Sequence, residues 1–514
     1  MTTNAPPHEP EKLGRDVFVV AGVVVLGAIM SILDVTVVSV AQPAFTNDFN
    51  TNTAGAAWSM TGYTLALAAV IPISSWAASR FGTKKVYLTS LVVFILGSAL
   101  CALAWSIGSL VAFRMIQGFG GGLLMPIGMM IMTRAAGPER VGSVMAILGV
   151  PMLLGPICGP ILGGWLIEVA SWHWVFLINI PIGIVALVYA WFALKDDAQP
   201  SPAKIDFVGL AMLSPGLALF LFGVSSSAEH RTFNNVSVYV PAIIGAALIA
   251  GFIWHAFHAK NPLLDLRLFR NPVLRTATIC MVFFMIAFFG ASLLYPQYFI
   301  LVRGETTLMA GLLLAPQGIG SILTMPIAGK LTDKIGPGKV VLPGLVLITI
   351  GVAIFTTLDT DTSYWLLGGA LFIQGLGMGM TMMPIMSAAL ATLRGAEVAD
   401  GSTLVNVVQQ TSSSIGTAVM TVIFTSLLGP FTLRLINTGG DEAKAGAILK
   451  EATEQGVTPL DLLGDAASAY GTTFIVATVL VALTVIPALF LPRRKMVAAV
   501  EEGVDVSAPP PVMH

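Results

Sequence analysis

The chain has 514 residues, of which 56% are hydrophobic and 10% are charged, and its formal net charge is -1. Soluble globular domains carry about 25% charged residues, so this chain has too little polar surface for a water-soluble protein. A charge close to zero, with basic residues scattered along the chain, also excludes a basic face for nucleic acid. The composition therefore indicates an integral membrane protein without a nucleic-acid partner.

The cysteines and the N-terminal stretch point to neither a disulfide framework nor a signal peptide. Cys101, Cys158 and Cys280 lie inside apolar runs, where cysteine is usually a small core residue. The polar stretch 1–16 lacks the apolar core and cleavage site of a signal peptide. We expect it to be kept as a tail, and we expect no metal site.

Long apolar runs recur along the chain and lack the period-2 alternation of a membrane β-barrel. Crossing a hydrocarbon core of ~30 Å takes about 20 residues of helix. The predicted fold class is therefore an all-α integral membrane protein. Fourteen transmembrane helices are predicted, at about 17–41, 57–78, 86–106, 109–133, 141–167, 173–194, 207–226, 237–257, 276–301, 308–329, 339–357, 365–388, 402–428 and 470–492.

The spans fall into two groups of six, separated by a central pair. We expect the long outer loop near the C-terminal end to be partly ordered at most. The predicted division is an N-terminal tail at 1–16, an N-terminal six-helix bundle at 17–200, two inserted transmembrane helices at 201–260, a C-terminal six-helix bundle at 261–492 that includes the outer loop 429–468, and a C-terminal tail at 493–514.

Basic residues give the orientation, because short cytoplasmic loops hold most Lys and Arg in membrane proteins. With the N-terminus inside, most of the 26 basic residues are cytoplasmic, and those left outside are Arg231, Arg303, Arg434, Lys444 and Lys450. Both termini are therefore predicted to be cytoplasmic. Trp172 and Trp174 are expected to anchor the outer membrane interface.

Two patterns recur about half a chain apart, as in transporters built from two related bundles. IQGFGGG at 116–122 recurs as IQGLGMG at 373–379, a shift of 257 residues. RFG at 80–82 recurs as KIG at 334–336, a shift of 254 residues. The repeats indicate that a six-helix unit was duplicated and that the central pair was inserted between the copies, outside the bundles.

Asp34 is the one acidic residue that falls deep inside a predicted span. Deep charges are costly and usually face a water-filled path. At 1.5 Å per residue, Asp34 lies roughly 10 Å and Arg114 roughly 8 Å from the outer ends of their helices. The matching depths predict an ion pair. Two interpretations stay open: Asp34 alternates between a proton and Arg114, or the pair is a permanent salt bridge that fixes two helices.

Several segments carry motifs. LDVTVVSVAQP at 33–43 is similar to LDxTxxNxAxP, RMIQG at 114–118 to RxxQG, and WHWVFLINIPIG at 172–183 to WRWxFxxNxPxG. The fifth span follows an antiporter motif through Gly149, Gly155, Gly159, Pro160, Gly163 and Gly164. Together they resemble the fourteen-span drug:proton antiporters of the major facilitator superfamily, EmrB/QacA type, and most closely the EmrB-like branch.

Two loops resemble the family motif GxLxDRxGRK. SWAASRFGTK at 75–84 lacks the acidic residue, a departure that EmrB-like members share, whereas GKLTDKIG at 329–336 keeps it. The resemblance implies two cytoplasmic gating loops, and it implies that close packing of the fifth-span glycines limits proton leak. The candidate gating residues are Arg80, Gly82, Lys84, Gly329, Asp333, Lys334 and Gly336.

A drug site needs apolar walls with a few polar anchors, and methionine-rich surfaces accept varied ligands. We hypothesise a central, largely apolar cavity between the two halves. The candidate lining residues are Gln117, Met125, Phe284, Phe288, Tyr295, Gln297, Gln374, Met383, Asn406, Gln409 and Gln410.

No nucleotide-binding motif GxxxxGK[ST] occurs in the sequence, so an ion gradient is the expected energy source and no cofactor is expected; the resemblance implies that the ion is the proton. The resemblance implies a non-enzymatic, proton-coupled exporter of lipophilic or amphiphilic compounds, working by alternating access in the bacterial inner membrane. It also implies contact with membrane lipids and, in a Gram-negative bacterium, a periplasmic adaptor and an outer-membrane channel. Two alternatives are a dedicated exporter of one endogenous lipid or amphiphile, and a membrane sensor or structural protein that transports nothing.

Overall fold

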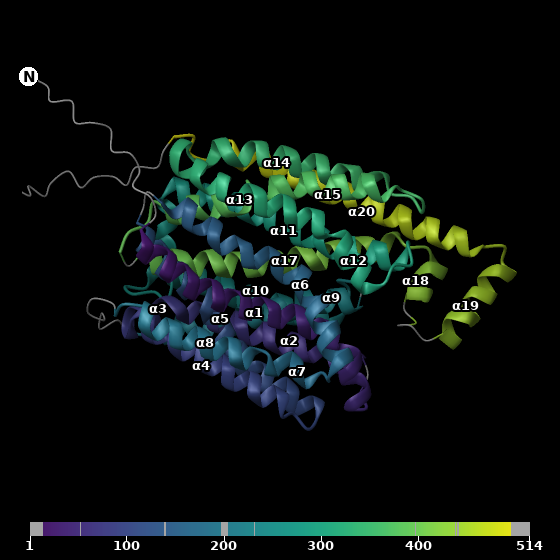
Figure 1. Ribbon diagram of the computed structural model, residues 1–514, viewed down its shortest axis with the longest axis horizontal. Helices are drawn as coiled ribbons and strands as arrows, with labels where there is room; N and C mark the ends of the chain where they lie inside the picture. The colour runs from purple at the N-terminus through teal and green to yellow at the C-terminus, as the bar shows by residue number, and fades with distance from the viewer. Residues whose placement is uncertain are drawn as a thin grey trace, which may run out of the picture.

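The computed structural model describes residues 14–51, 53–137, 140–196, 204–230, 232–395, 397–436, 438 and 442–494. These residues form helices and connecting loops, with no strand among them. Figure 1 shows long helices running side by side along the longest axis of the molecule. The predicted all-helical fold is confirmed.

The N-terminal half is formed by the helices that precede residue 200. Their bounds are α1 (Arg15–Asp48), α2 (Thr53–Val70), η1 (Ile71–Ile73), α3 (Ser74–Phe81), α4 (Thr83–Ala102), α5 (Ile107–Ala136), α6 (Val141–Val169), α7 (His173–Leu177) and α8 (Asn179–Ala193).

The central pair and the C-terminal half follow. Their bounds are α9 (Phe207–His230), α10 (Val236–His258), η3 (Leu266–Arg270), α11 (Pro272–Leu301), α12 (Thr307–Leu313), α13 (Ala315–Ile335), α14 (Pro337–Ile354), η4 (Phe355–Thr357), α15 (Tyr364–Gly379), α16 (Met382–Leu390), α17 (Glu397–Leu427), α18 (Pro430–Ile436), α19 (Glu442–Glu454) and α20 (Pro459–Ala488).

Local sequence signals explain where several of these helices begin. Ser106 and Ser109 form a capping box at the start of α5, in which each side chain accepts a hydrogen bond from the other's backbone N–H. Thr458 and Asp461 form the same arrangement at α20. Such caps satisfy backbone donors that a first helical turn leaves without partners.

Twelve helices among the described residues are long and apolar enough to cross a membrane, so the chain is a multi-pass membrane protein. The predicted number of fourteen is not confirmed by this criterion. The two predicted spans outside the twelve correspond to α6 and α17, which are 29 and 31 residues long. α17 is rich in Ser, Thr and Gln, and several side chains of α6 lie outside the described residues. A total of fourteen therefore stays a prediction.

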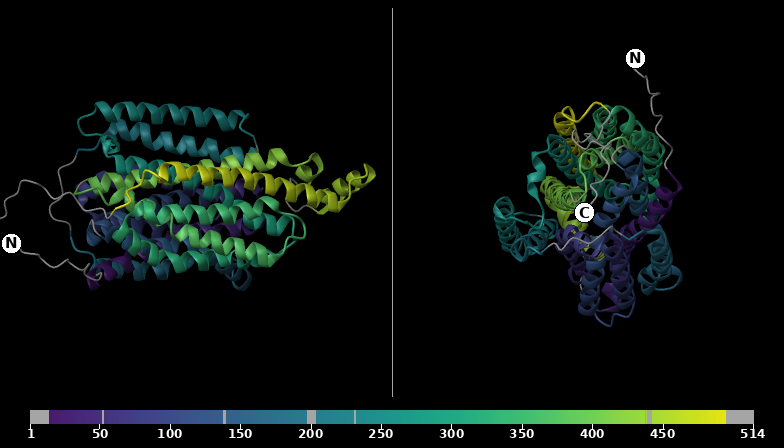
Figure 2. Two further views of the ribbon diagram at one scale, coloured as in Figure 1. Left: turned by 90° about the horizontal axis from the view of Figure 1, so that it is seen from above. Right: turned by 90° about the vertical axis from the view of Figure 1, so that its left-hand side faces the viewer.

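α9 and α10 pack closely against each other and lie along one side of the bundle, as both views of Figure 2 show. α9 also packs against α2 from the first half and α17 from the second half. The pair therefore lies outside the bundles, as predicted, and it covers a seam between the two halves. His255 Nε2 of α10 lies within hydrogen-bond distance, 3.0 Å, of the carboxylate of Asp206, just before α9.

We call the end of the bundle at which α1 begins and α20 ends the terminus-side end; it lies on the left in Figure 1. The two halves contact each other through α6, which packs against α12, α13 and α16, and through α17, which packs against α5, η1 and α3. Gly82 and Gly336 make the equivalent tight turns after α3 and α13, with φ of 87° and 90°. Glycine suits these positions because residues with a Cβ rarely adopt such angles.

The outer loop contains helices that its polar composition did not predict. Residues 429–468 contain α18 and α19, which lie beyond the main bundle at the right in Figure 1, and α20 begins at Pro459, well before the predicted span at 470–492. Arg434 donates two hydrogen bonds to Glu451, at 2.9 and 2.8 Å, and so joins α18 to α19. Polar composition alone does not reveal these pairings, and the degree of order of the loop stays a prediction.

Candidate functional site

Asp34 of α1 and Arg114 of α5 form an ion pair inside the first half. Arg114 Nη1 donates to Asp34 Oδ2, and neither side chain is exposed. The pairing predicted from the depths of the two residues is confirmed. Because removing two charges from water is expensive, a buried pair persists only with close geometry and additional hydrogen bonds.

Two side-chain amides supply such hydrogen bonds at Asp34 Oδ1. Gln117 Nε2 donates to this oxygen at 2.8 Å, and Asn179 Nδ2 donates at 2.9 Å. Gln117 Oε1 also accepts from Arg114 Nη1 at 2.8 Å, so Gln117 joins both members of the pair. Gln117, a candidate for the substrate cavity, is fully buried at this site.

Arg114 is held from a second direction by α2. Its Nε donates to the carbonyl oxygen of Ser59 at 3.1 Å, and its guanidinium carbon lies 4.1 Å from the centre of the Tyr63 ring. Tyr63 in turn shares a hydrogen bond of 3.2 Å with Ser31 of α1. Arg114 Nη2 has no hydrogen-bond partner among the described residues.

Sequence reasoning missed the roles of Asn179 and Ser98. Asn179 Nδ2 also donates to Ser98 Oγ at 3.1 Å, and Ser98 Oγ donates to the carbonyl oxygen of Phe176 at 2.9 Å. Asn179 lies in a recognised motif, but nothing in that motif places it at Asp34. The available signal was a polar residue in the first turn of an otherwise apolar helix.

Glycines of α6 pack along α1 on both sides of Asp34. A Cβ at Gly155 would overlap Ile32, a Cβ at Gly159 would overlap Thr36, and one at Gly163 would meet Val37 at 3.1 Å. The spacing of four residues keeps these glycines on one helix face. The stripe therefore allows close contact with the part of α1 that carries Asp34.

The other residues of the antiporter motif behave differently. Gly149 faces the second half, where a Cβ would lie 2.7 Å from Met325 and 2.8 Å from Met383. A Cβ at Gly164 would meet no atom within 4 Å, so this glycine is not closely packed. The side chain of Pro160 lies outside the described residues.

Asp333 joins the two halves at the terminus-side end. Its carboxylate accepts from the backbone N–H groups of Gly142 and Ser143, both at 2.9 Å, and from Ser143 Oγ at 2.5 Å. The Asp333 carboxylate lies against the first turn of α6, where the helix dipole favours a negative charge. Gly329 allows this approach, since a Cβ there would lie 2.8 Å from Gly142 O. We call this contact the second clasp.

An equivalent contact joins α3 to α17, and we call it the first clasp. Ser75 Oγ donates to Asp400 Oδ1, and the hydroxyls of Ser74 and Thr403 share a hydrogen bond of 2.7 Å. With the repeat offset of 257 residues, Asp400 is the position in the second half that is equivalent to Ser143 of the second clasp. The first loop motif lacks its acidic residue, and Asp400 of the facing helix α17 supplies a carboxylate in its place. Sequence reasoning missed this role of Asp400.

The basic residues of the gating loops lie outside these clasps. Arg80 and Lys334 are exposed. Lys84 lies 3.9 Å from Asp196, which follows α8, and its amino group is 5.9 Å from the centre of the Trp191 ring. These contacts stay within the first half.

The candidate cavity residues come from α5, α11, α15, α16 and α17 and differ in burial. Asn406 Nδ2 donates to Ser402 O at 2.8 Å and contacts Met129 Sδ at 3.1 Å. Those that are nearly or fully buried are Gln117, Phe284, Tyr295, Gln374, Met383 and Asn406. Those that are half-buried are Met125, Phe288, Gln297, Gln409 and Gln410.

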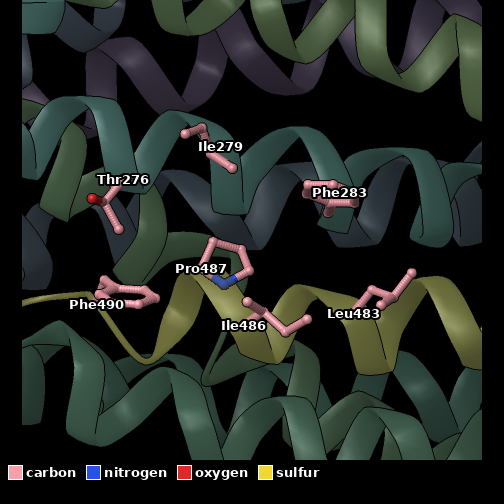
Figure 3. A pocket seen from close by; sticks show the side chains of 7 residues that line it. All are labelled: Thr276, Ile279, Phe283, Leu483, Ile486, Pro487 and Phe490. Carbon is pink, nitrogen blue, oxygen red and sulfur yellow. The ribbon is translucent and has the colours of Figure 1, made fainter.

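Two apolar cavities are found on the bundle surface, and neither is lined by a candidate cavity residue. The smaller, of about 280 Å³, lies between α9 and α10. The larger, of about 350 Å³, lies between α11 and α20 (Figure 3) and is lined by Thr276, Ile279, Phe283, Leu483, Ile486, Pro487 and Phe490. The central cavity stays a prediction. No cluster of potential metal ligands occurs in the part of the chain that the structure describes.

Trp172 corrects one expectation about the outer interface. Its side chain is 4% exposed, and its Nε1 donates to Asp48 Oδ2 at 2.6 Å. Phe45 and Phe49 of α1 pack against its ring with centroid distances of 5.2 and 5.4 Å. Trp172 therefore fixes the end of α1 instead of facing the membrane, whereas Trp174 is 49% exposed.

Comparisons with known proteins agree with this architecture. The chain is 45% identical over 496 residues to the multidrug resistance protein B homolog of Mycobacterium tuberculosis strain H37Rv, covering 95% of this chain and 92% of that protein. It is 28% identical over 407 residues to the multidrug export protein EmrB of Escherichia coli strain K12, covering 78% and 79% of the two chains.

The solved structure of the human organic anion transporter MFSD10 (TETRAN) has the same fold. It matches 92% of this chain and 100% of its own with a TM-score of 0.60, at 14% identity. Residues 24–417 match the family model described as Major Facilitator Superfamily. The chain therefore belongs to the Major Facilitator Superfamily, a family of membrane transporters and not of enzymes.

Proposed function

We propose that the chain is a drug:H⁺ antiporter, which exports lipophilic or amphiphilic compounds in exchange for protons. The observation that supports this most is the Asp34–Arg114 ion pair, in which a carboxylate 1% exposed is held by a cation and two amides. The multidrug names of the relatives support the substrate class.

Exchange between a proton and Arg114 provides the coupling. A buried carboxylate that loses its cation pays a desolvation penalty of several kcal/mol, so Asp34 takes up a proton when it separates from Arg114. The separation requires α1 and α5 to move relative to each other. Proton binding and helix movement are therefore parts of one step.

The glycine stripe of α6 limits proton leak in this mechanism. Gly155 and Gly159 bring the α6 backbone against α1 at Ile32 and Thr36, which lie two residues before and two residues after Asp34. Such close contact leaves no room for a water chain between the two helices. Water reaches Asp34 only when the halves rearrange.

The two clasps act as the gate at the terminus-side end, which we propose is cytoplasmic. Asp333 holds α6, and Asp400 is held by Ser75 of α3, so both contacts must break before the halves separate there. With both termini in the cytoplasm, the proposed location is the bacterial inner membrane. The division into two bundles at 17–200 and 261–492, with an insertion at 201–260, gives the two rocking units.

The substrate site proposed here is a chamber between the halves. Phe288, Gln297, Gln409 and Gln410 are half-buried and combine apolar walls with amides that can anchor a ligand. No cofactor takes part. In a Gram-negative host, a periplasmic adaptor and an outer-membrane channel complete the export route.

Transport by the purified protein in proteoliposomes tests the proposal. Vesicles loaded with a lipophilic fluorescent dye are given a pH gradient of either direction, and dye movement is followed over a panel of substrates. We expect dye transport that reverses with the gradient and that stops when a protonophore is added. Transport that does not depend on the pH gradient would contradict proton coupling. Transport of only one lipid from the substrate panel would favour the dedicated exporter.

A further inference from the structure

Asp34 meets more hydrogen-bond donors than an ion pair requires. Its Oδ2 accepts from Arg114, while its Oδ1 accepts from both Gln117 and Asn179. Each donor favours the charged carboxylate, because a carboxylate accepts hydrogen bonds and a neutral carboxyl must donate one. Proton uptake by Asp34 therefore has to overcome three donors, of which only one is a cation.

Asn179 differs from the other two donors in how it is held. Arg114 and Gln117 share α5 and move together with it, but Asn179 begins α8. Its Nδ2 donates at the same time to Ser98 Oγ of α4, whose own hydrogen goes to Phe176 O. Because the Ser98 hydroxyl donates its hydrogen to the carbonyl oxygen of Phe176, its oxygen can only accept a hydrogen bond from Asn179. This fixes the orientation of the Asn179 side-chain amide.

The titratable groups around Asp34 are few in the described part of the chain. Arg114 faces it from α5, Tyr63 from α2 and Cys101 from α4, each close enough to interact electrostatically with the carboxylate or its partner cation. Tyr63 and Cys101 are neutral at ordinary pH. Changes at Asn179 therefore alter a neutral donor and leave the charges around Asp34 unchanged.

We propose that Asn179, fixed by Ser98, is a positioning residue that sets the pH at which Asp34 takes up its proton. The inference rests on the proposed function, since it assigns the tuning of the same proton site. A fixed amide donor keeps Asp34 charged and paired with Arg114 until α1 moves away from α8. Without that donor, Asp34 binds its proton at a higher pH than in the wild type.

Infrared titration of the purified full-length protein tests the assignment without transport. The carbonyl band of a protonated buried carboxyl is recorded against pH, and the band that disappears in Asp34→Asn is assigned to Asp34. We expect Asn179→Leu, which keeps side-chain volume but removes the amide, to move the midpoint upward by about one pH unit or more. Ser98→Ala, which only releases the amide, should move it upward by less.

Ser90→Ala is the matched control, because Ser90 is also a buried serine of α4 but donates within its own helix, to Val86 O at 2.7 Å. It should leave the midpoint unchanged. A midpoint that stays at the wild-type value in both Asn179→Leu and Ser98→Ala would overturn the inference while leaving the proposed function intact. If the wild type has no band that Asp34→Asn removes, Asp34 does not titrate, and the proposed function falls together with this inference.

Should Asn179→Leu fail to purify as a folded, monodisperse protein, Ser98→Ala alone decides. An upward shift supports the positioning role, and no shift contradicts it. Dye transport in proteoliposomes then distinguishes a change in the pH at which Asp34 binds its proton from a general packing defect. A tuned site displaces the pH optimum of transport in the same direction as the infrared midpoint, whereas a packing defect lowers transport equally at every pH.

Discussion

Arg114 Nη1 is shared between two acceptors, Asp34 Oδ2 and Gln117 Oε1. When Asp34 becomes neutral, Gln117 can therefore keep hold of the guanidinium, with Ser59 O and the Tyr63 ring as further contacts. A cation that keeps these partners does not have to follow the carboxylate. This arrangement suits a pair that opens and closes better than one that only fixes two helices.

Arg114→Ala tests whether the pair is a switch. The change leaves Asp34 buried without its cation, which costs about 3–5 kcal/mol unless the carboxyl takes a proton. Asp34 should then hold its proton to higher pH, so the pH dependence of substrate binding should move upward. Fluorescence polarisation of a bound dye, recorded across pH, measures this shift.

Arg303→Ala is a suitable comparison for that experiment. Arg303 stacks on Tyr364 at 4.4 Å, between α11 and α15 and far in sequence from the Asp34 site. Its loss should leave the pH profile of binding in place. An unchanged profile in Arg114→Ala itself would show that this arginine is purely structural.

Gly159→Ala should impair transport because the added methyl would overlap Thr36 of α1. Overpacking of this kind typically costs about 1–3 kcal/mol and would push α6 away from the helix that carries Asp34. We expect slower substrate transport and a faster passive proton leak in proteoliposomes. Gly164→Ala, with nothing within 4 Å of the new methyl, should behave like the wild type. Equal leak in both variants would argue against a sealing role for the stripe.

Asp333→Ala should loosen the second clasp. The variant removes the acceptor of three hydrogen bonds from Gly142 and Ser143. Since hydrogen bonds to charged groups contribute about 1.5–3 kcal/mol each, the terminus-side end should open at least ~10-fold more often. Distances between spin labels on the two halves report this opening. Asp361→Ala, which removes an exposed carboxylate at the opposite end, should change nothing.

The first clasp should respond to pH through Asp400, which lies in the first turn of α17, ahead of the predicted span at 402–428. Burial, together with the nearby Asp265, raises the pKa of Asp400 from 3.8 to about 6. The closed clasp therefore binds a proton that the open, hydrated form releases. Closure should weaken as the pH rises from about 4 to about 6 and should then stay level.

Asp400→Asn checks this pH response. The amide keeps a hydrogen-bond acceptor for Ser75 but cannot ionise, so spin-label distances across the terminus-side end should no longer depend on pH between 4 and 6. The wild-type distances should shift toward the open form over the same range. A variant that follows the wild-type curve would assign the response to another group.

Much of the fold could be predicted from the sequence, because membrane spans are defined by apolar runs of sufficient length. The Asp34–Arg114 pair could also be predicted, since the depth of a residue along a straight helix follows from counting. The rotation of a helix about its axis was harder to infer. Gln117 lies three residues from Arg114 and so shares its face, yet it was expected among the polar anchors of the substrate cavity.

Contacts between distant helices could not be predicted in the same way. Asn179 of α8 reaches Asp34 of α1 and is held by Ser98 of α4, and their meeting depends on how these three helices pack. The Ser75–Asp400 bond joins residues 325 positions apart, and only the packing of α3 on α17 reveals it. The missing acid in the first loop was visible in the sequence, but the helix that supplies its replacement was not.

The most direct test of the account is proton release on substrate binding. Purified protein in a weakly buffered solution with a pH indicator is mixed with a saturating lipophilic substrate, and the wild type is compared with Asp34→Asn. We predict that the wild type releases protons on mixing, and that Asp34→Asn binds the same substrate without releasing any. Equal proton release from the two proteins would contradict the claim that Asp34 carries the exchanged proton.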